Sequence, residues 1–324
     1  MAVTDGLTIK RIIDDGNDFR LHGAATYIIT TERGVDGTSC EQLQNIDGVR
    51  SAGAVRIASP TPTLVALPAG TLPLHEATRG FLPLLGVEAR VAQQASYLIS
   101  RQAADQLSAE SGSDLTTSHG TAHIDAIYEY ADDGRNSSLL YAAVGIVPTE
   151  GRFDECWIQA WPLTDAVPTL LRTTLSASVR PDAKVRISQL NPRFGEHYDG
   201  LSLYENRLTR YAPPAGMAIG FCIGAISVRL RRLEFAAALQ VGVSRVALTV
   251  QIVLETLASA AITTALCSPV LAAVAHAAGR ANEVGIFATE MEAVLASSIG
   301  CLIGSVASTI AVRKRHLFNY FKAR

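Results

Sequence analysis

The chain has 324 residues, with 28 Lys and Arg, 30 Asp and Glu and a formal net charge of −2. Residues 211–324 hold 10 of the basic and 5 of the acidic side chains, so residues 1–210 hold the other 18 and 25. The acidity of the first part argues against nucleic acid as a partner, since phosphate binding needs clustered Lys and Arg. We therefore predict two domains, residues 1–210 and 211–324, of different chemistry.

Residues 1–210 alternate short apolar segments with Gly-containing turns, a pattern typical of an α+β domain. We predict strands at residues 25–31, 49–58 and 155–162. We predict helices at residues 40–45, 72–82, 91–107 and 163–175. Residues 123–147 are predicted to form a hairpin around Asp133 and Gly134. Residues 204–216 are expected to form a stalk, which Pro213 and Pro214 break where it enters the membrane.

The second part of the chain carries three long runs without charge, at residues 211–228, 256–279 and 293–312. A helix of 18 residues is about 27 Å long at 1.5 Å per residue, close to the ~30 Å hydrocarbon core of a bilayer. Buried helices of a soluble domain, the alternative, rarely stay uncharged over such lengths. The sequence therefore predicts three spanning helices, at about residues 211–230, 250–276 and 290–312.

The charges that flank these runs predict an orientation. Basic clusters at residues 229–232 and 313–316 follow the first and third runs, whereas the connection between the second and third runs is acidic. Short cytoplasmic segments are enriched in Lys and Arg. We therefore expect a multi-pass protein of the cytoplasmic membrane, with residues 229–249 and the C-terminal tail inside the cell and residues 1–210 outside it.

The stretch RRLEFAAALQVGVSR, residues 231–245, is predicted to form an interfacial helix. Its apolar stripe is expected to contain Leu233, Ala236, Ala237, Gln240 and Val241. Arg231 and Arg232 are expected to reach the lipid headgroups, where their stems can snorkel. Glu234 and Gln240 are expected on or near the wet side, with a bend at Gly242 and Ser244. A plain loop with arginines that stop membrane transfer is the alternative.

This order of features resembles the FtsX-like permease domain of ABC transporters. Two basic residues, Glu234, a small apolar helix and VGVSR are followed by Glu255 early in the next span, and the resemblance covers residues 211–324. It implies that the segment between the first two spans docks on a separate ATPase subunit and transmits motion into the spans. The coupling residues so implied are Arg231, Arg232, Glu234, Gln240, Gly242, Ser244 and Arg245.

Residues 1–210 resemble the extracytoplasmic domain of MacB-type permeases. The fold class expected is an α+β extracytoplasmic domain of the MacB-like periplasmic core type, followed by an all-α membrane domain of three transmembrane helices. That family has a spanning helix before the outer domain. Residues 1–24 hold no apolar run of even ten residues, so we expect the chain to lack its N-terminal span.

The resemblance implies an export permease, in which ATP hydrolysis on a partner subunit drives export or mechanical transmission. ATP and Mg²⁺ are expected on the ATPase, no cofactor on this chain, and a second permease chain, identical or different, in the complex. The alternative is a regulatory FtsX-like protein that controls a cell-wall hydrolase and translocates nothing. An enzyme is disfavoured, because the chain has no phosphate-binding G-x-x-x-x-G-K-[ST] motif and no nucleophile–base spacing.

The remaining candidate residues are cysteines, glycines and possible metal ligands. Outside the cytoplasm a disulfide persists, so Cys40 and Cys156 are proposed to pair, with two unpaired buried thiols as the alternative. Close helix packing is expected from the spacing of Gly216, Gly220, Gly224, Gly300 and Gly304. His119, His123 and Asp125 would share one face of a strand, but an exposed polar strand is commoner than a metal site. Glu255 and His276 are expected to be solvated near the ends of their span.

Overall fold

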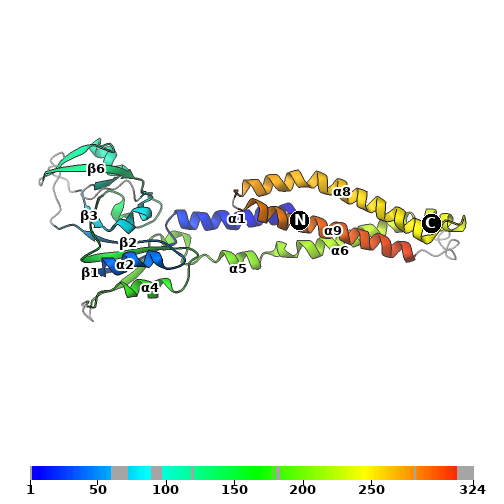
Figure 1. Ribbon diagram of the computed structural model, residues 1–324, viewed down its shortest axis with the longest axis horizontal. Coiled ribbons are helices and arrows are strands. Elements are labelled where there is room, and N and C mark those ends of the chain that lie inside the picture. The colour runs from blue at the N-terminus through cyan, green and yellow to red at the C-terminus, as the bar shows by residue number, and fades with distance from the viewer. Residues whose placement is uncertain are drawn as a thin grey trace. The chain divides into compact units, whose positions relative to one another are not determined.

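The computed structural model describes residues 2–59, 72–88, 97–117, 120–177, 179, 183–280 and 282–311. The chain forms two compact units (Figure 1). We call Gly16–Asp199 the sheet unit, and Met1–Asp15 with Gly200–Arg324 the helical unit. The sheet unit is a mixed sheet with helices, and the helical unit contains three long apolar helices. The α+β and all-α fold classes that the sequence predicts for the two parts are therefore confirmed.

The described residues of the sheet unit form a nine-stranded sheet in the order β5-β6-β4-β7-β3-β2-β8-β1-β9. The strands are β1 Thr26–Asp36, β2 Val49–Ile57, β3 Leu74–Ala77, β4 Tyr97–Ser100, β5 Asp114–Thr117, β6 Gly120–Tyr128, β7 Ala143–Ile146, β8 Arg152–Ala160 and β9 Arg186–Gln189. Strands β3 and β7 pair in parallel, as do β4 and β6, and the other pairs are antiparallel. Strand β8 lies between β1 and β2 and is the central strand of the antiparallel part of the sheet, β3-β2-β8-β1-β9.

Short helices connect these strands. They are α2 Gly37–Gln42, η1 Leu43–Asn45, η2 Arg79–Leu85, α3 Arg101–Leu107, η3 Ser137–Leu139, α4 Val167–Thr173 and η4 Pro192–Phe194. Successive side chains of a strand point to opposite faces, so β8 contributes to two cores. Trp157 packs against Phe81 on one face, with ring centroids 5.1 Å apart, and Cys156 and Ile158 are buried on the other.

Two segments predicted as helices begin as strands. Residues 72–82 contain strand β3 followed by the 3₁₀ helix η2. Of the predicted helix at 91–107, residues 91–96 lie outside the described part of the chain, Tyr97–Ser100 is strand β4, and only Arg101–Leu107 is helical. Short apolar runs do not distinguish a buried strand from a helix, and the partners of both strands lie far away in the sequence.

The predicted hairpin at residues 123–147 is wrong. Strand β6 pairs with β4 and β5, and β7 pairs with β3 and β4, so the two strands are not neighbours. Gly134 does adopt a left-handed φ of 103°, and the Asp133 carboxylate lies 2.7 Å from the Arg135 guanidinium. The turn chemistry was identified correctly, but a turn fixes only the local direction of the chain and not which strands pair.

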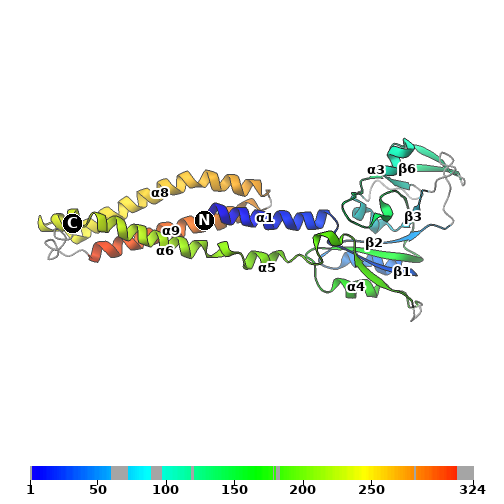
Figure 2. The same cartoon turned by 180° about the vertical axis from the view of Figure 1, so that it is seen from behind.

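The helical unit contains the first part of α1 Ala2–Leu21, followed by α5 Gly200–Glu205, η5 Leu208–Tyr211, α6 Ala212–Leu230, α7 Arg232–Gln240, α8 Arg245–Ala277 and α9 Glu283–Ala311. Within the described residues, three helical segments are long and apolar enough to cross a membrane: Gly200–Leu230, Arg245–Ala277 and Glu283–Ala311. Helices α6 and α9 lie side by side in both opposite views (Figures 1 and 2). Helix α8 begins five residues before the predicted second span.

Two details of this unit differ from the expectations. Pro213 and Pro214 begin α6 rather than break it, because proline lacks only an N–H that has no helical partner in the first turn. The polar segment that opens the chain, for which no element was predicted, forms α1. Within the helical unit, Ile9 of α1 packs with Ala275, Ala278 and Ile286.

Candidate functional site

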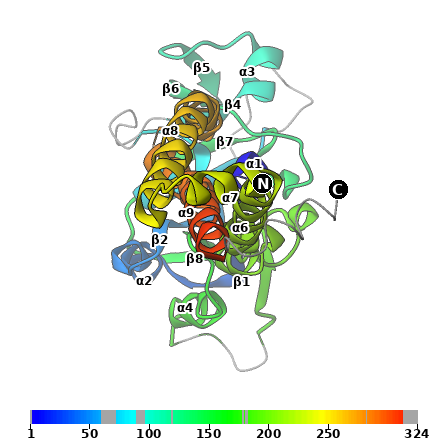
Figure 3. The same ribbon diagram turned by 90° about the vertical axis from the view of Figure 1, so that its right-hand side faces the viewer.

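The connection between α6 and α8 is a packed corner. We call residues Val228 to Glu255 the α7 corner. Helix α7 buries one face against both neighbouring helices, and the cluster consists of Val228, Phe235, Ala236, Leu239, Leu248 and Ile252. Figure 3 shows α7 lying across the ends of α6 and α8. Helix α7 is therefore held to both helices by one continuous apolar cluster.

The buried face of α7 shares Ala236 with the stripe predicted from the sequence but also contains residues outside that stripe. Phe235 and Leu239, four residues apart, are buried together with Ala236. Of the predicted stripe, Ala237 and Gln240 are exposed, and Val241 is 87% exposed. Within the protein, α7 is anchored on the side of α6 and α8 through a face that contains Phe235, and contact of the predicted stripe with lipid stays a prediction.

Arg231 links the three helices of the corner. Its Nη1 lies 2.6 Å from Oε2 of Glu255 on α8, and its Nε lies 3.1 Å from Oε2 of Glu234 on α7. The guanidinium carbon lies 5.2 Å from the Phe235 ring centroid. The hydrogen bond to Glu255, followed by the one to Glu234, raises the pKa of Arg231. Arg231 thus has protein partners inside the corner, and its contact with lipid headgroups stays a prediction.

Glu255 is held on both oxygens. Oε2 accepts from Arg231, and Oε1 accepts from Nε2 of Gln251, one turn earlier in α8, at 2.9 Å. The side chains of Arg231 and Glu255 are 41% and 45% exposed, and exposed ion pairs typically contribute only about 0–1 kcal/mol. The network therefore adds little to stability, and it joins the end of α6 to α7 and α8. The expectation that Glu255 is simply solvated is incomplete.

Gly242 and Ser244 form the bend between α7 and α8. Gly242 has a φ of 100°, a conformation that glycine adopts without steric cost. The Ser244 hydroxyl accepts from the Ala247 backbone N–H at 3.1 Å and caps the N-terminus of α8. The predicted coupling segment 229–249 thus consists of the end of α6, Arg231, the short helix α7, a four-residue link and the first turn of α8.

A second face of the corner is exposed. Its residues on and just after α7 are Glu234, Ala237, Gln240 and Val241. Arg245 and Val246 continue this exposed surface onto α8, and Val246 is 72% exposed. Arg232 is half-buried. The face combines charged, polar and aliphatic groups and is the part of the corner that a further protein can reach.

The five predicted packing glycines form one contact between α6 and α9. A Cβ at Gly216 would lie 3.2 Å from the Ala293 carbonyl oxygen. A Cβ at Gly220 or Gly224 would collide with the carbonyl oxygen of a residue on α9, Ser297 or Cys301 respectively. A Cβ at Gly300 or Gly304 would likewise collide with Met217 or Phe221 of α6. The missing side chains let the two backbones touch reciprocally, as in membrane helix pairs with small residues four apart.

Helix α9 also carries a buried carboxylate that the sequence did not single out. Glu290 is 0% exposed, and neither carboxylate oxygen has a hydrogen-bond partner among the residues that the structure describes. It lies against Gly6 of α1, where a Cβ would collide with Oε1. Asp5, one residue earlier, lies 2.9 Å from Nε of Arg207. The packing of α1 thus buries both acidic groups, and this helix was not predicted from its polar sequence.

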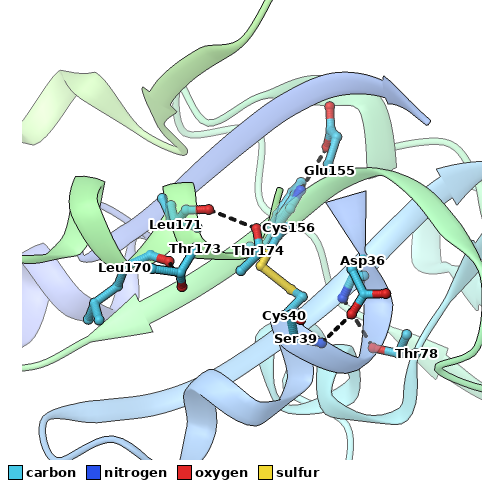
Figure 4. The surroundings of a disulfide bond; sticks show 12 residues. Asp36, Ser39, Cys40, Thr78, Glu155, Cys156, Leu170, Leu171, Thr173 and Thr174 are labelled. Carbon is cyan, nitrogen blue, oxygen red and sulfur yellow. Dashed lines mark hydrogen bonds between the residues drawn. A yellow bond between two sulfur atoms is a disulfide. The ribbon is translucent and has the colours of Figure 1, made fainter. Parts of the chain in front are cut away.

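The sheet unit contains a disulfide between Cys40 of α2 and Cys156 of β8 (Figure 4). Both cysteines are 0% exposed and lie in the core beneath α2. The Asp36 carboxylate accepts from the Ser39 backbone N–H at 2.8 Å and starts α2 one turn before Cys40. This is the pair proposed from the sequence. In the described residues, the other cysteines, Cys222, Cys267 and Cys301, are free thiols on α6, α8 and α9.

The possible metal ligands that the structure describes, His123 and Asp125, lie on strand β6. His123 lies on β6 with Nδ1 2.7 Å from Oδ1 of Asp114 on β5, and both side chains are about half exposed or more. His119 lies outside the described residues. Across the described part of the chain, no three His, Cys, Asp or Glu side chains come close enough to hold a metal ion.

Comparison with known proteins gives matches only among solved structures. No model of a protein family matches the sequence, and no curated protein matches it. The fold is similar to the periplasmic region of MacB from Actinobacillus actinomycetemcomitans, at 11% identity over 54% of this chain and 94% of that one, with a TM-score of 0.40. It is also similar to the extracellular domain of the noncanonic ABC-type transporter YknZ from Gram-positive bacteria, at 12% identity over 45% of this chain and 88% of that one, with a TM-score of 0.31.

Proposed function

We propose that this chain is an FtsX-like permease subunit of an ABC transporter, and that the α7 corner receives motion from a separate ATPase. The observation that carries the proposal is the double attachment of α7. Its buried face packs on α6 and α8 together, and Arg231 joins the end of α6 to Glu234 and Glu255. A push on α7 would therefore tilt two spans at once rather than deform a loop.

The lengths of three helical segments and the positions of the basic residues support the placement of this chain in the membrane. Three segments of 29 to 33 residues are long and apolar enough to span, and the α7 corner carries the basic cluster expected inside the cell. The sheet unit then lies outside the cytoplasm. Its buried disulfide is consistent with that side, because cytosolic reductants oppose structural disulfides.

The ATPase would dock on the exposed face of the corner, formed by Glu234, Ala237, Gln240 and Val241. ATP and Mg²⁺ would be bound by that ATPase, which supplies the energy for export or for mechanical transmission to the sheet unit. The working complex would contain a second permease chain, identical or different. The contact between α6 and α9 lies within one chain. Most residues of α8 are exposed, so α8 is the helix that would face lipid or the second chain.

The test is co-purification. The full chain, extracted from its native membranes in mild detergent, should retain an ATPase that is identified by photolabelling with an ATP analogue. Reversing one charge on the docking face, Glu234→Lys, should remove that subunit from the complex. Glu283→Lys is the matched control, since Glu283 begins α9 after the α8–α9 connection, far along α8 from α7.

The outcomes separate docking from misfolding. The E234K chain should elute as the same detergent complex minus the ATPase and should keep its disulfide. An ATPase that stays bound to E234K as tightly as to E283K would contradict the docking face. The absence of any ATPase from the parent complex would contradict the proposed function as a whole.

A further inference from the structure

We propose that a groove on the sheet unit binds an organic cation with an apolar body, and that the Glu155 carboxylate pairs with its positive charge. The groove lies on one face of strands β1, β2, β3 and β8, beside η3. This inference does not depend on the proposed function, since it concerns residues of the sheet unit alone.

The groove has the size of a small-molecule site. Its volume is about 420 Å³, within the range of roughly 300–1,000 Å³ found for ligand pockets. The apolar residues at the groove are Val55, Ile57, Leu139 and Trp157, of which all but Ile57 are buried in the core. Ile57 is 62% exposed, so this large aliphatic side chain borders the groove and is not covered by the other described residues. A ligand with apolar surface would gain from covering it.

Glu155 supplies the polar anchor. Its Oε2 accepts from the Trp157 indole N–H at 2.7 Å, whereas Oε1 is only 3.4 Å from the Thr30 hydroxyl. Burial raises the pKa of Glu155, and the hydrogen bonds from Trp157 and Thr30 lower it by less. The protein alone therefore compensates this negative charge poorly, and one oxygen remains available to a strong N–H donor from a ligand.

The other charged groups at the groove make it acidic. Glu32 and Asp154 also line it, and Asp154 accepts from the backbone N–H groups of Arg33 and Ile57. Arg56 is the cation in the lining, but its Nε lies 2.7 Å from the Glu76 carboxylate. Of the neighbours that lower the pKa of Glu155, Arg186 on β9 has the smallest effect. The local field thus favours a positive ligand.

The remaining titratable group at the groove does not reverse this charge. His75 lines the groove and is 8% exposed, and burial lowers its pKa, so the ring is neutral at neutral pH. A metal ion is disfavoured as the cation, because no three acidic or imidazole side chains converge among the described residues. The ligand that fits is an ammonium donating to Oε1 of Glu155, with its carbon skeleton over the exposed Ile57 side chain.

Three probes of the same skeleton test the proposal. Equilibrium dialysis of the full chain in detergent would compare phenethylammonium, 2-phenylethanol and 3-phenylpropanoate, with protein-free micelles subtracted. Phenethylammonium should bind at least about tenfold more tightly than the alcohol, as hydrogen bonds to charged groups are worth more than neutral ones. Phenylpropanoate should not compete with it.

Two variants locate the binding. Glu155→Gln should remove the preference for the ammonium probe, while the amide oxygen still accepts from Trp157. Ile57→Lys changes an exposed side chain, leaves the core intact and should abolish binding by placing a lysine ammonium in the groove. Asp114→Asn removes a carboxylate on β5 that does not line the groove, and should leave binding unchanged.

Three results would overturn the assignment. The first is equal binding of the ammonium and the alcohol, or no binding of the ammonium at millimolar concentration. The second is an unchanged ammonium preference in Glu155→Gln or Ile57→Lys with an unaltered thermal midpoint. The third is the same loss in Asp114→Asn, which would indicate general attraction of cations to an acidic domain.

Discussion

Arg231 and Glu255 are 24 residues apart in the sequence and 2.6 Å apart in the structure, where they join the end of α6 to α8. Arg231 also caps two helices, because it follows the last residue of α6 and precedes the first of α7. One side chain thus lies where the chain changes direction and is bonded to the helix that follows. This arrangement attaches α7 firmly to the two neighbouring helices α6 and α8.

The first prediction separates docking from transmission. Glu255→Gln removes the charge that ties Arg231 to α8 but leaves the exposed face of α7 unchanged. The ATPase should therefore still co-purify, whereas its activity in the reconstituted complex should change several-fold relative to the parent. Loss of the ATPase from the Glu255→Gln complex would contradict this, since it would place Glu255 in docking.

The second prediction concerns the α6–α9 contact. A methyl group at Gly220 would meet the Ser297 carbonyl oxygen, and one at Gly300 would meet that of Met217. Gly220→Ala and Gly300→Ala should each destabilise the helical unit by at least about 1–3 kcal/mol, the usual cost of overpacking. Thermal unfolding in detergent would measure the change.

Gly285 provides the control for that experiment. It lies on the same helix α9, and a Cβ there meets nothing within 4 Å. Gly285→Ala should be neutral or slightly stabilising, since alanine has the higher helix propensity. Equal losses at positions 220, 285 and 300 would show that the effect is not the reciprocal backbone contact.

The third prediction concerns the disulfide. Cys40 and Cys156 are 116 residues apart in the sequence, so the bond closes a long loop and restricts the unfolded chain. The double variant C40A/C156A should lose about 2–4 kcal/mol of unfolding free energy in the sheet unit. Both tryptophans, Trp157 and Trp161, lie in that unit and report its unfolding by fluorescence. Cys222→Ala on α6 should leave this transition unchanged, and an equal shift would contradict the assignment.

The fourth prediction is a pH dependence. Burial lowers the pKa of His75, against a smaller opposite effect of the Ser138 backbone. The unfolded chain, with a His pKa of about 6.5, then binds the proton more readily than the folded one. Stability is therefore complete above that value and is lost as the pH falls below it.

Denaturant unfolding at pH 7.5 and 5.5, followed by tryptophan fluorescence, would measure this loss. His75→Gln should flatten the pH dependence, although it lowers stability at pH 7.5. His123→Gln changes a half-exposed histidine on β6 and should retain the slope of the parent. An unchanged slope in His75→Gln would assign the acid sensitivity to other groups.

The helical unit could be predicted far more completely from the sequence than the sheet unit could. Uncharged runs of 18 residues and more have few uses besides spanning a membrane, so α6, α8 and α9 were evident without any contact. The glycines four residues apart similarly indicated a close helix pair before their partner was known. In each case the information lies within one continuous segment.

The errors arose where distant segments determine the structure. Leu74–Ala77 and Tyr97–Ser100 are strands because β7 and β6 pair with them, and nothing local distinguishes them from helices. Helix α1 contains Gly6, Gly16 and the buried Asp5, residue types that disfavour a helix interior when the sequence is considered alone. The anchoring face of α7 depends on where α6 and α8 lie, which the sequence of α7 alone cannot specify.

The side of the membrane on which the α7 corner lies is the central claim, and cysteine labelling measures it most directly. Val241, 87% exposed at the end of α7, would be replaced by Cys in a chain whose free Cys222, Cys267 and Cys301 are alanine. Leu201→Cys, at a position 68% exposed in α5, is the matched site on the opposite side. We expect a membrane-impermeant maleimide on intact cells to label position 201 and to reach position 241 only after permeabilisation. Labelling of position 241 in intact cells would contradict the account.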